Sequence, residues 1–140
     1  MLMQETYRMF GGTDRVIEPF MAAIEMIIPI PLFMMTCLPW IMMSIAGTKT
    51  THVVYGEDMG ILTGDALLNY AFETAASAFE MAPEKSLLIG KALKILAEKA
   101  GIYGMIGGQV VDVASCGVGL DEGMLNFIYE LKTGALIEVR

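Results

Sequence analysis

The sequence predicts an all-α protein, and two observations carry that prediction. Apolar residues recur at helical spacing in most segments outside residues 28–48. No segment shows the sustained alternation of apolar and polar residues that is typical of strands. A chain of 140 residues is long enough for one domain with a core. We therefore expect a single helical domain, 1–140, that contains an aberrant apolar segment, 28–48.

The first two helices are predicted from apolar stripes and from the residues that precede them. Asp14 is a candidate N-cap for a helix whose apolar stripe runs from Val16 to Ile27. Gly64 is expected to break the chain before the second helix, 65–79. The stripe of that helix consists of Leu68, Ala71, Phe72, Ala75 and Phe79.

Three more helices are predicted in the second half of the chain. Pro83 suits the first turn of a helix over 84–100, which should turn Lys91, Lys94 and Glu98 outward. A fourth helix is expected over about 104–115 and a fifth over 121–139, because the glycine-rich stretch 117–119 between them is typical of a turn. The apolar stripe predicted for the third helix consists of Leu87, Leu88, Ala92, Ile95 and Leu96.

The charge and cysteine content exclude several classes of function. The net charge is −7 with nine basic residues, and no basic cluster follows a phosphate backbone, so we expect no nucleic-acid partner. Cys37 and Cys116 provide neither a disulfide framework nor metal-ligand spacing. The only histidine, His52, receives no role. With no signal-peptide pattern over residues 1–10, we expect a cytoplasmic protein.

A membrane interpretation has to be weighed for Ile27–Gly47. This stretch carries no charged side chain, and about 20 apolar residues can span a bilayer. However, Pro29, Pro31 and Pro39 remove backbone donors within it. We therefore expect no transmembrane helix, and a membrane-associated relic stays as an alternative.

Four motifs in the second part of the chain point to a family. They are VYGEDM at Val54–Met59, GDALLN at Gly64–Asn69, GMIGGQVVD at Gly104–Asp112, and ELKTGALI at Glu130–Ile137. In order and spacing they resemble the polyprenyl diphosphate synthases, most closely the bacterial farnesyl diphosphate synthase (geranyltranstransferase) type. The resemblance implies a partial domain of the all-helical isoprenoid synthase bundle. It also implies a prenyltransferase that condenses isopentenyl diphosphate with an allylic diphosphate.

The resemblance assigns four substrate-binding residues on the allylic diphosphate side. Gln109 and Asp112 match the family's Gly-Gln-x-x-Asp pattern, and they lie three residues apart on one helical face. Lys132 and Thr133 match its Lys-Thr pair, whose charge and hydroxyl suit phosphate oxygens. Without the family context, a solvent-facing polar stripe and a snorkelling lysine at a helix end would be the commoner explanations. The glycines at 107–108 are expected to allow close helix packing.

Residues 28–48 depart from the family, which has its first aspartate-rich motif there. The segment has no acidic residue, yet the codons of Met34-Met35-Thr36 contain two adjacent aspartate codons in a displaced reading frame. The codons of Trp40-Ile41-Met42-Met43 contain two more, separated by one residue, which gives the spacing D-D-x-x-x-x-D-x-D. The hypothesis is a frameshift over 28–48. A natural apolar insertion is the alternative.

The missing motif determines what the chain is expected to do. The family uses Mg²⁺ held by two aspartate-rich motifs, and the chain as written also stops before the second, so we expect a truncated protein that binds no metal. We assign no catalytic residue and expect the chain to be catalytically incompetent. Intact relatives would bind both diphosphates and Mg²⁺, and a homodimer is one assembly to consider. The alternative function is a non-catalytic helical interaction protein. The prolines should break the family's straight helix near Pro29–Pro31 and again near Pro39.

Overall fold

The computed structural model describes residues 2–30, 44–45, 48–49, 51–115, 117 and 119–138. Apart from two two-residue strands, the regular elements among these residues are all helices, so the predicted all-α class is confirmed. The elements are α1 (Leu2–Met9), α2 (Glu18–Ile27), β1 (Ser44–Ile45), β2 (Thr48–Lys49), α4 (Thr51–Tyr55), α5 (Glu57–Ala76), α6 (Ala78–Met81), η1 (Pro83–Lys85), α7 (Ser86–Ala100), α8 (Met105–Ala114), α9 (Glu122–Tyr129), η2 (Glu130–Gly134) and α10 (Ala135–Ile137).

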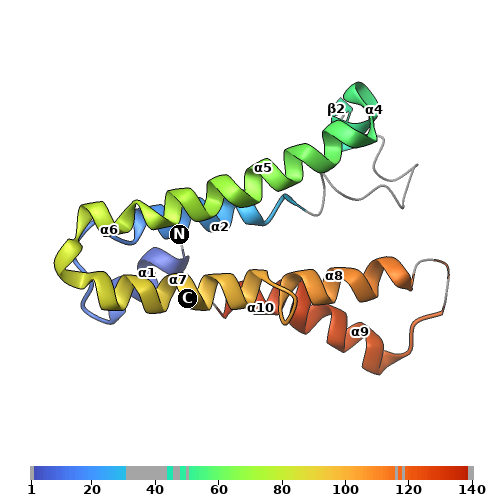
Figure 1. Ribbon diagram of the computed structural model, residues 1–140. Helices are drawn as coiled ribbons and strands as arrows, with labels where there is room; N and C mark the ends of the chain where they lie inside the picture. Colours follow the sequence, from blue (N-terminus) through green and yellow to red (C-terminus); the bar gives the residue numbers. More distant parts are fainter. Residues whose placement is uncertain are drawn as a thin grey trace.

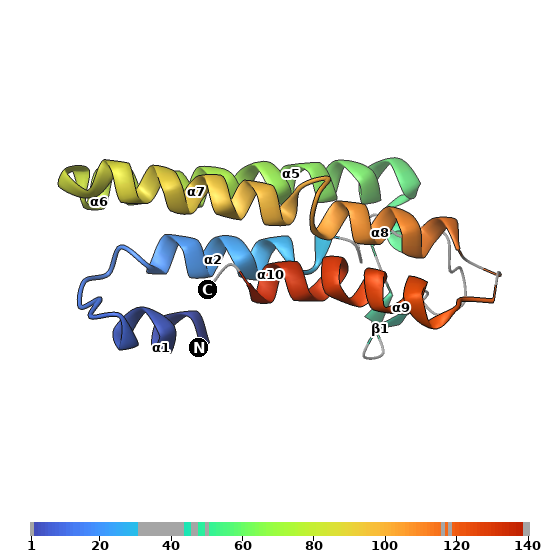
Figure 2. The same cartoon turned by 90° about the horizontal axis from the view of Figure 1, so that it is seen from below.

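The helices form two arms that meet at the turn made by α6 and η1 (Figure 1). In one arm the long helix α5 packs along α2. In the other arm α7 leads into α8, and α9, η2 and α10 return beside them (Figure 2). The polar motifs at 104–112 and 130–137 therefore lie together in the second arm, although about 20 residues separate them in the sequence.

One hydrophobic core joins the two arms. Ala23, Ala71 and Ala75 are completely buried, and such small side chains let α2 and α5 approach closely. Among the residues that the structure describes, the largest fully buried side chains are Ile27 of α2 and Leu96 of α7. The predicted stripes of α2 and α5 are confirmed as the inward faces, because their remaining members pack against this core.

Two predicted boundaries in the first half are wrong. α5 begins at Glu57, and Gly64 lies buried inside it instead of breaking the chain. Burial of this face outweighs the helix penalty of a glycine, about 1 kcal/mol. α2 begins at Glu18, with no side-chain cap. Asp14 instead accepts a hydrogen bond from the Val16 backbone N–H at 3.1 Å in the preceding turn.

The predicted inward face of α7 is only partly correct. Ile89, Leu96 and Ala100 form the buried stripe, whereas Leu87 and Leu88 are 74% and 63% exposed. The helix is apolar on more than one face, so periodicity alone cannot choose which face packs. The outward positions of Lys91, Lys94 and Glu98 are confirmed. Pro83 begins a short 3-10 turn ahead of the helix, as its restricted backbone favours.

The break expected near Pro29 is confirmed, because α2 ends at Ile27. Farther along, β1 and β2 pair in antiparallel fashion, with Ser44 opposite Lys49 and Ile45 opposite Thr48, which the sequence did not predict. The break expected near Pro39 lies outside the described residues. Within the part of the chain that the structure describes, no helix combines the length and apolarity needed to cross a membrane.

Candidate functional site

The α8 helix presents two of the predicted site residues. Gln109 and Asp112 both lie on it, three residues apart, as expected. Both polar atoms of the Gln109 side chain are buried and find no hydrogen-bond partner among the described residues. Buried amide groups are normally satisfied, because an unmade bond costs roughly 1–3 kcal/mol. The Gln109 amide is therefore suited to a polar partner outside the described set.

The other two site residues, Lys132 and Thr133, lie on η2. This element is a turn of π-helix over Glu130–Gly134, inserted between α9 and α10 where the sequence predicted one continuous helix. Such π turns are uncommon and are frequently found at functional sites. No feature of the residue pattern indicated it.

A short ion pair joins the two motifs. The Lys132 Nζ atom donates to Asp112 Oδ2 at 2.6 Å, and the two side chains are 33% and 29% exposed. The structure thus brings Gln109, Asp112 and Lys132 to the packed region of α8 and η2, while Thr133 is exposed on the same turn. A lysine ammonium at the edge of this region can bind an anionic group.

Gly108 explains why α8 and η2 can lie so close. A Cβ atom at this position would come within 2.5 Å of the Lys132 backbone nitrogen and 2.9 Å of Leu131 Cβ. No side chain fits such a space without displacing one of the two elements. The predicted role in close helix packing is confirmed for Gly108. Because this residue has no side chain, the turn that carries Lys132 can lie directly against α8.

Sequence reasoning missed a second polar cluster, at the other end of the molecule. The Tyr7 hydroxyl donates to Asp14 Oδ1 at 2.7 Å, and Lys85 pairs with Asp14 Oδ2. The hydrogen bond from Lys85, followed by that from Tyr7, lowers the pKa of the Asp14 carboxyl to about 2. Asp14 and Lys85 are 71 residues apart, so only the fold could reveal this contact.

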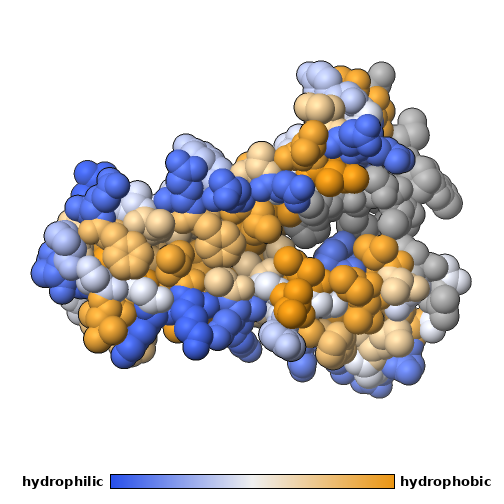
Figure 3. Space-filling view, viewed as in Figure 1, coloured by the Kyte–Doolittle hydropathy of each residue, from blue (hydrophilic) through white to orange (hydrophobic). Residues whose placement is uncertain are grey.

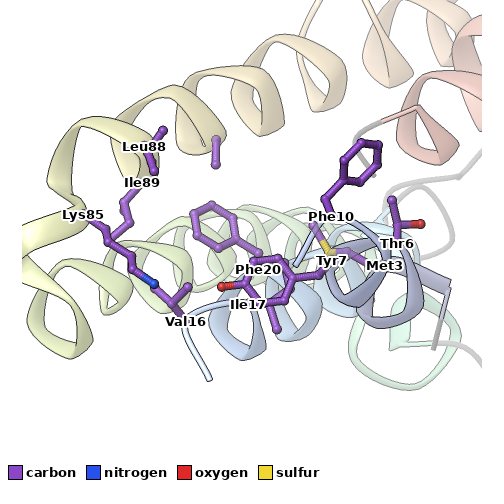
Figure 4. A pocket seen from close by; sticks show the side chains of 11 residues that line it. Met3, Thr6, Tyr7, Phe10, Val16, Ile17, Phe20, Lys85, Leu88 and Ile89 are labelled. Carbon is purple, nitrogen blue, oxygen red and sulfur yellow. The ribbon is translucent and has the colours of Figure 1, made fainter. Parts of the chain in front are cut away.

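An apolar pocket of about 350 Å³ adjoins that cluster (Figure 4). Phe10, Phe20, Leu88 and Ile89 project around it, with Lys85 at one side. Its lining comes from α1, α2, η1 and α7 and from the connection between α1 and α2, and includes no residue of α8, α9 or η2. The pocket is therefore separate from the region that holds Lys132 and Asp112.

The residues present do not fit a magnesium cluster. Mg²⁺ requires hard oxygen ligands such as carboxylates. No residue between Met26 and Gly56 is acidic. Among the described residues, no group of three or more His, Cys, Asp or Glu side chains is placed to hold a metal ion. Asp112, the carboxylate nearest to the predicted diphosphate contact, is already paired with Lys132.

Comparison with known proteins identifies close relatives. A chloroplastic geranylgeranyl pyrophosphate synthase of Catharanthus roseus is 39% identical over 142 residues, which cover 99% of this chain and 39% of the relative. A geranylgeranyl diphosphate synthase of Cyanophora paradoxa is 45% identical over 94 residues, which cover 66% of this chain and 30% of the relative. No family model matches the chain.

A solved structure supports the same relationship. The crystal structure of a geranyltransferase from Helicobacter pylori superposes with a TM-score of 0.78 at 29% identity, over 97% of this chain and 45% of that one. The chain thus spans less than half the length of each of these relatives. Its fold is that of the all-helical isoprenoid synthases, with a polar site at the contact of α8 and η2. The chain belongs to the polyprenyl diphosphate synthase family.

Proposed function

We propose that this chain is part of a prenyltransferase of isoprenoid biosynthesis and contributes the contact to an allylic diphosphate. Its intact relatives would join that substrate to isopentenyl diphosphate. The observation that carries the proposal is the approach of Lys132 Nζ to Asp112 Oδ2, 2.6 Å apart, at the contact of two family motifs. A lysine ammonium is a donor that suits phosphate oxygens, and the Gln109 amide, on the same helix as Asp112, finds no hydrogen-bond partner among the described residues.

We also propose that the chain as written does not catalyse the condensation. The family generally depends on magnesium, and the stretch from Met26 to Gly56 offers that ion no carboxylate. Methionine and isoleucine side chains, which are common in this stretch, cannot replace carboxylate oxygens as ligands of Mg²⁺. Lys132 can hold a diphosphate, and it cannot by itself stabilise the departure of that group.

The binding half of the proposal is tested with geranyl diphosphate and Lys132→Ala. Calorimetric titration should show weak binding to the wild-type chain and about tenfold or more loss in the variant, since a hydrogen bond to a charged group contributes roughly 1.5–3 kcal/mol. Lys94→Ala is the matched control, because Lys94 also forms a lysine–carboxylate pair, with Glu98 at 3.4 Å, on the separate helix α7. Equal affinity of the two variants would exclude Lys132 as the diphosphate contact.

The catalytic half is tested by incubating the chain with magnesium, isopentenyl diphosphate and geranyl diphosphate. We expect no prenyl product. A variant with residues 28–48 replaced by the sequence of the restored reading frame should bind Mg²⁺ where the chain as written does not. Product formation by the chain as written would contradict the proposal. Sequencing the coding DNA across codons 25–52 tests the frameshift directly.

One observation favours a second function, a helical interaction protein. Several large apolar side chains are exposed on and after α7, and Figure 3 shows apolar side chains gathered between hydrophilic edges on the viewed face. They include Leu87, Leu88, Ile102 and Tyr103. Concentration-dependent association in sedimentation experiments, lost in Leu87→Glu with Leu88→Glu, would support it. A homodimer is the simplest assembly of this kind. We propose that the protein is located in the cytoplasm.

A further inference from the structure

Asp112 accepts a hydrogen bond from the Lys132 ammonium, the same group that the proposed function assigns to the diphosphate. The bonded atoms are 2.6 Å apart, slightly closer than the roughly 2.7–2.9 Å of a charge-assisted N–H···O hydrogen bond. The pair bridges α8 and η2, and each side chain keeps about a third of its surface exposed. An anion from solution can therefore reach the ammonium, but it meets the Asp112 carboxylate there.

A carboxylate and a diphosphate can share one region when a divalent cation lies between them. The residues described here do not fit such a cation, because Met26–Gly56 contains no acidic side chain and no carboxylate cluster is present in the described ranges. Without it, the two anions repel each other and compete for the same ammonium. The Gln109 amide lies on the same helix and finds no hydrogen-bond partner among the described residues, so Asp112 does not occupy it.

We infer that Asp112 is an internal competitor that holds Lys132 and must be displaced before a diphosphate binds. This inference rests on the proposed role of Lys132 as the diphosphate contact. Asp112 is a positioning residue and not a catalytic one, because it acts through Lys132. Neutralising the Asp112 carboxylate should raise the affinity of the chain for a diphosphate. If Asp112 helped to hold the ligand, the same change would lower that affinity.

The experiment is a calorimetric titration with inorganic pyrophosphate in a chelator-containing buffer at one fixed ionic strength. Asp112→Asn keeps the size of the side chain and removes its charge. We expect this variant to bind pyrophosphate roughly threefold to tenfold more tightly than wild type, as the loss of a partly exposed pair allows. Asp65→Asn is the matched control, since Asp65 is exposed on α5 and its substitution changes the net charge by the same amount.

A second arm shows whether Asp112 acts through Lys132. In a Lys132→Ala background, the gain from Asp112→Asn should disappear, because there is no ammonium left to release. A purely structural role of Asp112 would change affinity in both backgrounds alike. Thermal unfolding of each variant verifies that it is folded before titration.

The outcomes separate the inference from the function on which it rests. Suppose that pyrophosphate binding depends on Lys132 but Asp112→Asn weakens it, or raises the affinity no more than Asp65→Asn does. That result would overturn the inference and leave the proposed function in place. Absence of binding in wild type and in Asp112→Asn at millimolar pyrophosphate would overturn both.

Discussion

Replacing Gly108 by alanine tests whether η2, which carries Lys132, packs closely against α8 at this glycine. The added Cβ would come within 2.5 Å of the Lys132 nitrogen, 2.9 Å of Leu131 Cβ and 3.0 Å of the Leu131 carbonyl carbon. Two of these three atoms belong to the backbone, so η2 must move as a unit. Overpacking of this kind costs about 1–3 kcal/mol of unfolding free energy.

The matched control is Gly90→Ala on α7, where nothing lies within 4 Å of the added atom. Both substitutions exchange glycine for alanine within a helix and gain about 1 kcal/mol of helix propensity. The difference between the two variants therefore isolates the clash. We expect Gly108→Ala to unfold at a lower temperature than Gly90→Ala by about 4–12 °C, from roughly 4 °C per kcal/mol in a domain of this size.

The assay is thermal unfolding followed by circular dichroism, with the wild-type chain as reference. Gly90→Ala should melt slightly above wild type. If Gly108→Ala melts as high as Gly90→Ala, α8 and η2 are not in close contact through this glycine, and the packing argument fails.

Three further predictions concern pH, capping and metal. Lys85 and Tyr7 hold the pKa of Asp14 at about 2, below its usual 3.8, so their contacts with the Asp14 carboxylate stabilise the fold above pH 4. This contribution is lost as the pH falls from 4 to 2. In thermal unfolding over that pH range, Asp14→Asn should lose less stability than wild type. Asp121→Ala removes the side-chain acceptor of the Met124 N–H, 2.8 Å away, and should cost about 0.5–2 kcal/mol in urea unfolding, whereas Asp65→Asn should cost almost nothing. When a chelator removes magnesium, the affinity of the chain for pyrophosphate should change by less than about twofold. A tenfold loss of affinity would reveal a metal site that these residues do not indicate.

The sequence alone determined much of the local structure. Helical periodicity placed the main helices, and Pro83 marked the turn that precedes α7. Asp121 caps α9 by accepting the Met124 N–H, at the residue where the sequence placed the start of that helix. These features depend on neighbours within about four residues in the chain, which a sequence displays directly. The motifs also named the candidate site residues before any contact was known.

The tertiary structure decided the remaining features, because they depend on residues far apart in the sequence. Leu87 and Leu88 follow the helical period of α7 as well as its buried residues do. Only packing against α5, α6 and α10 selects Ile89 and Leu96 for the core. Gly64 stays within α5 because that face is buried. The Lys132–Asp112 pair joins residues 20 apart, and the π turn that carries Lys132 has no marker in the residue pattern. Helices form from local preferences, whereas their faces, ion pairs and distortions are set by the elements against which they pack.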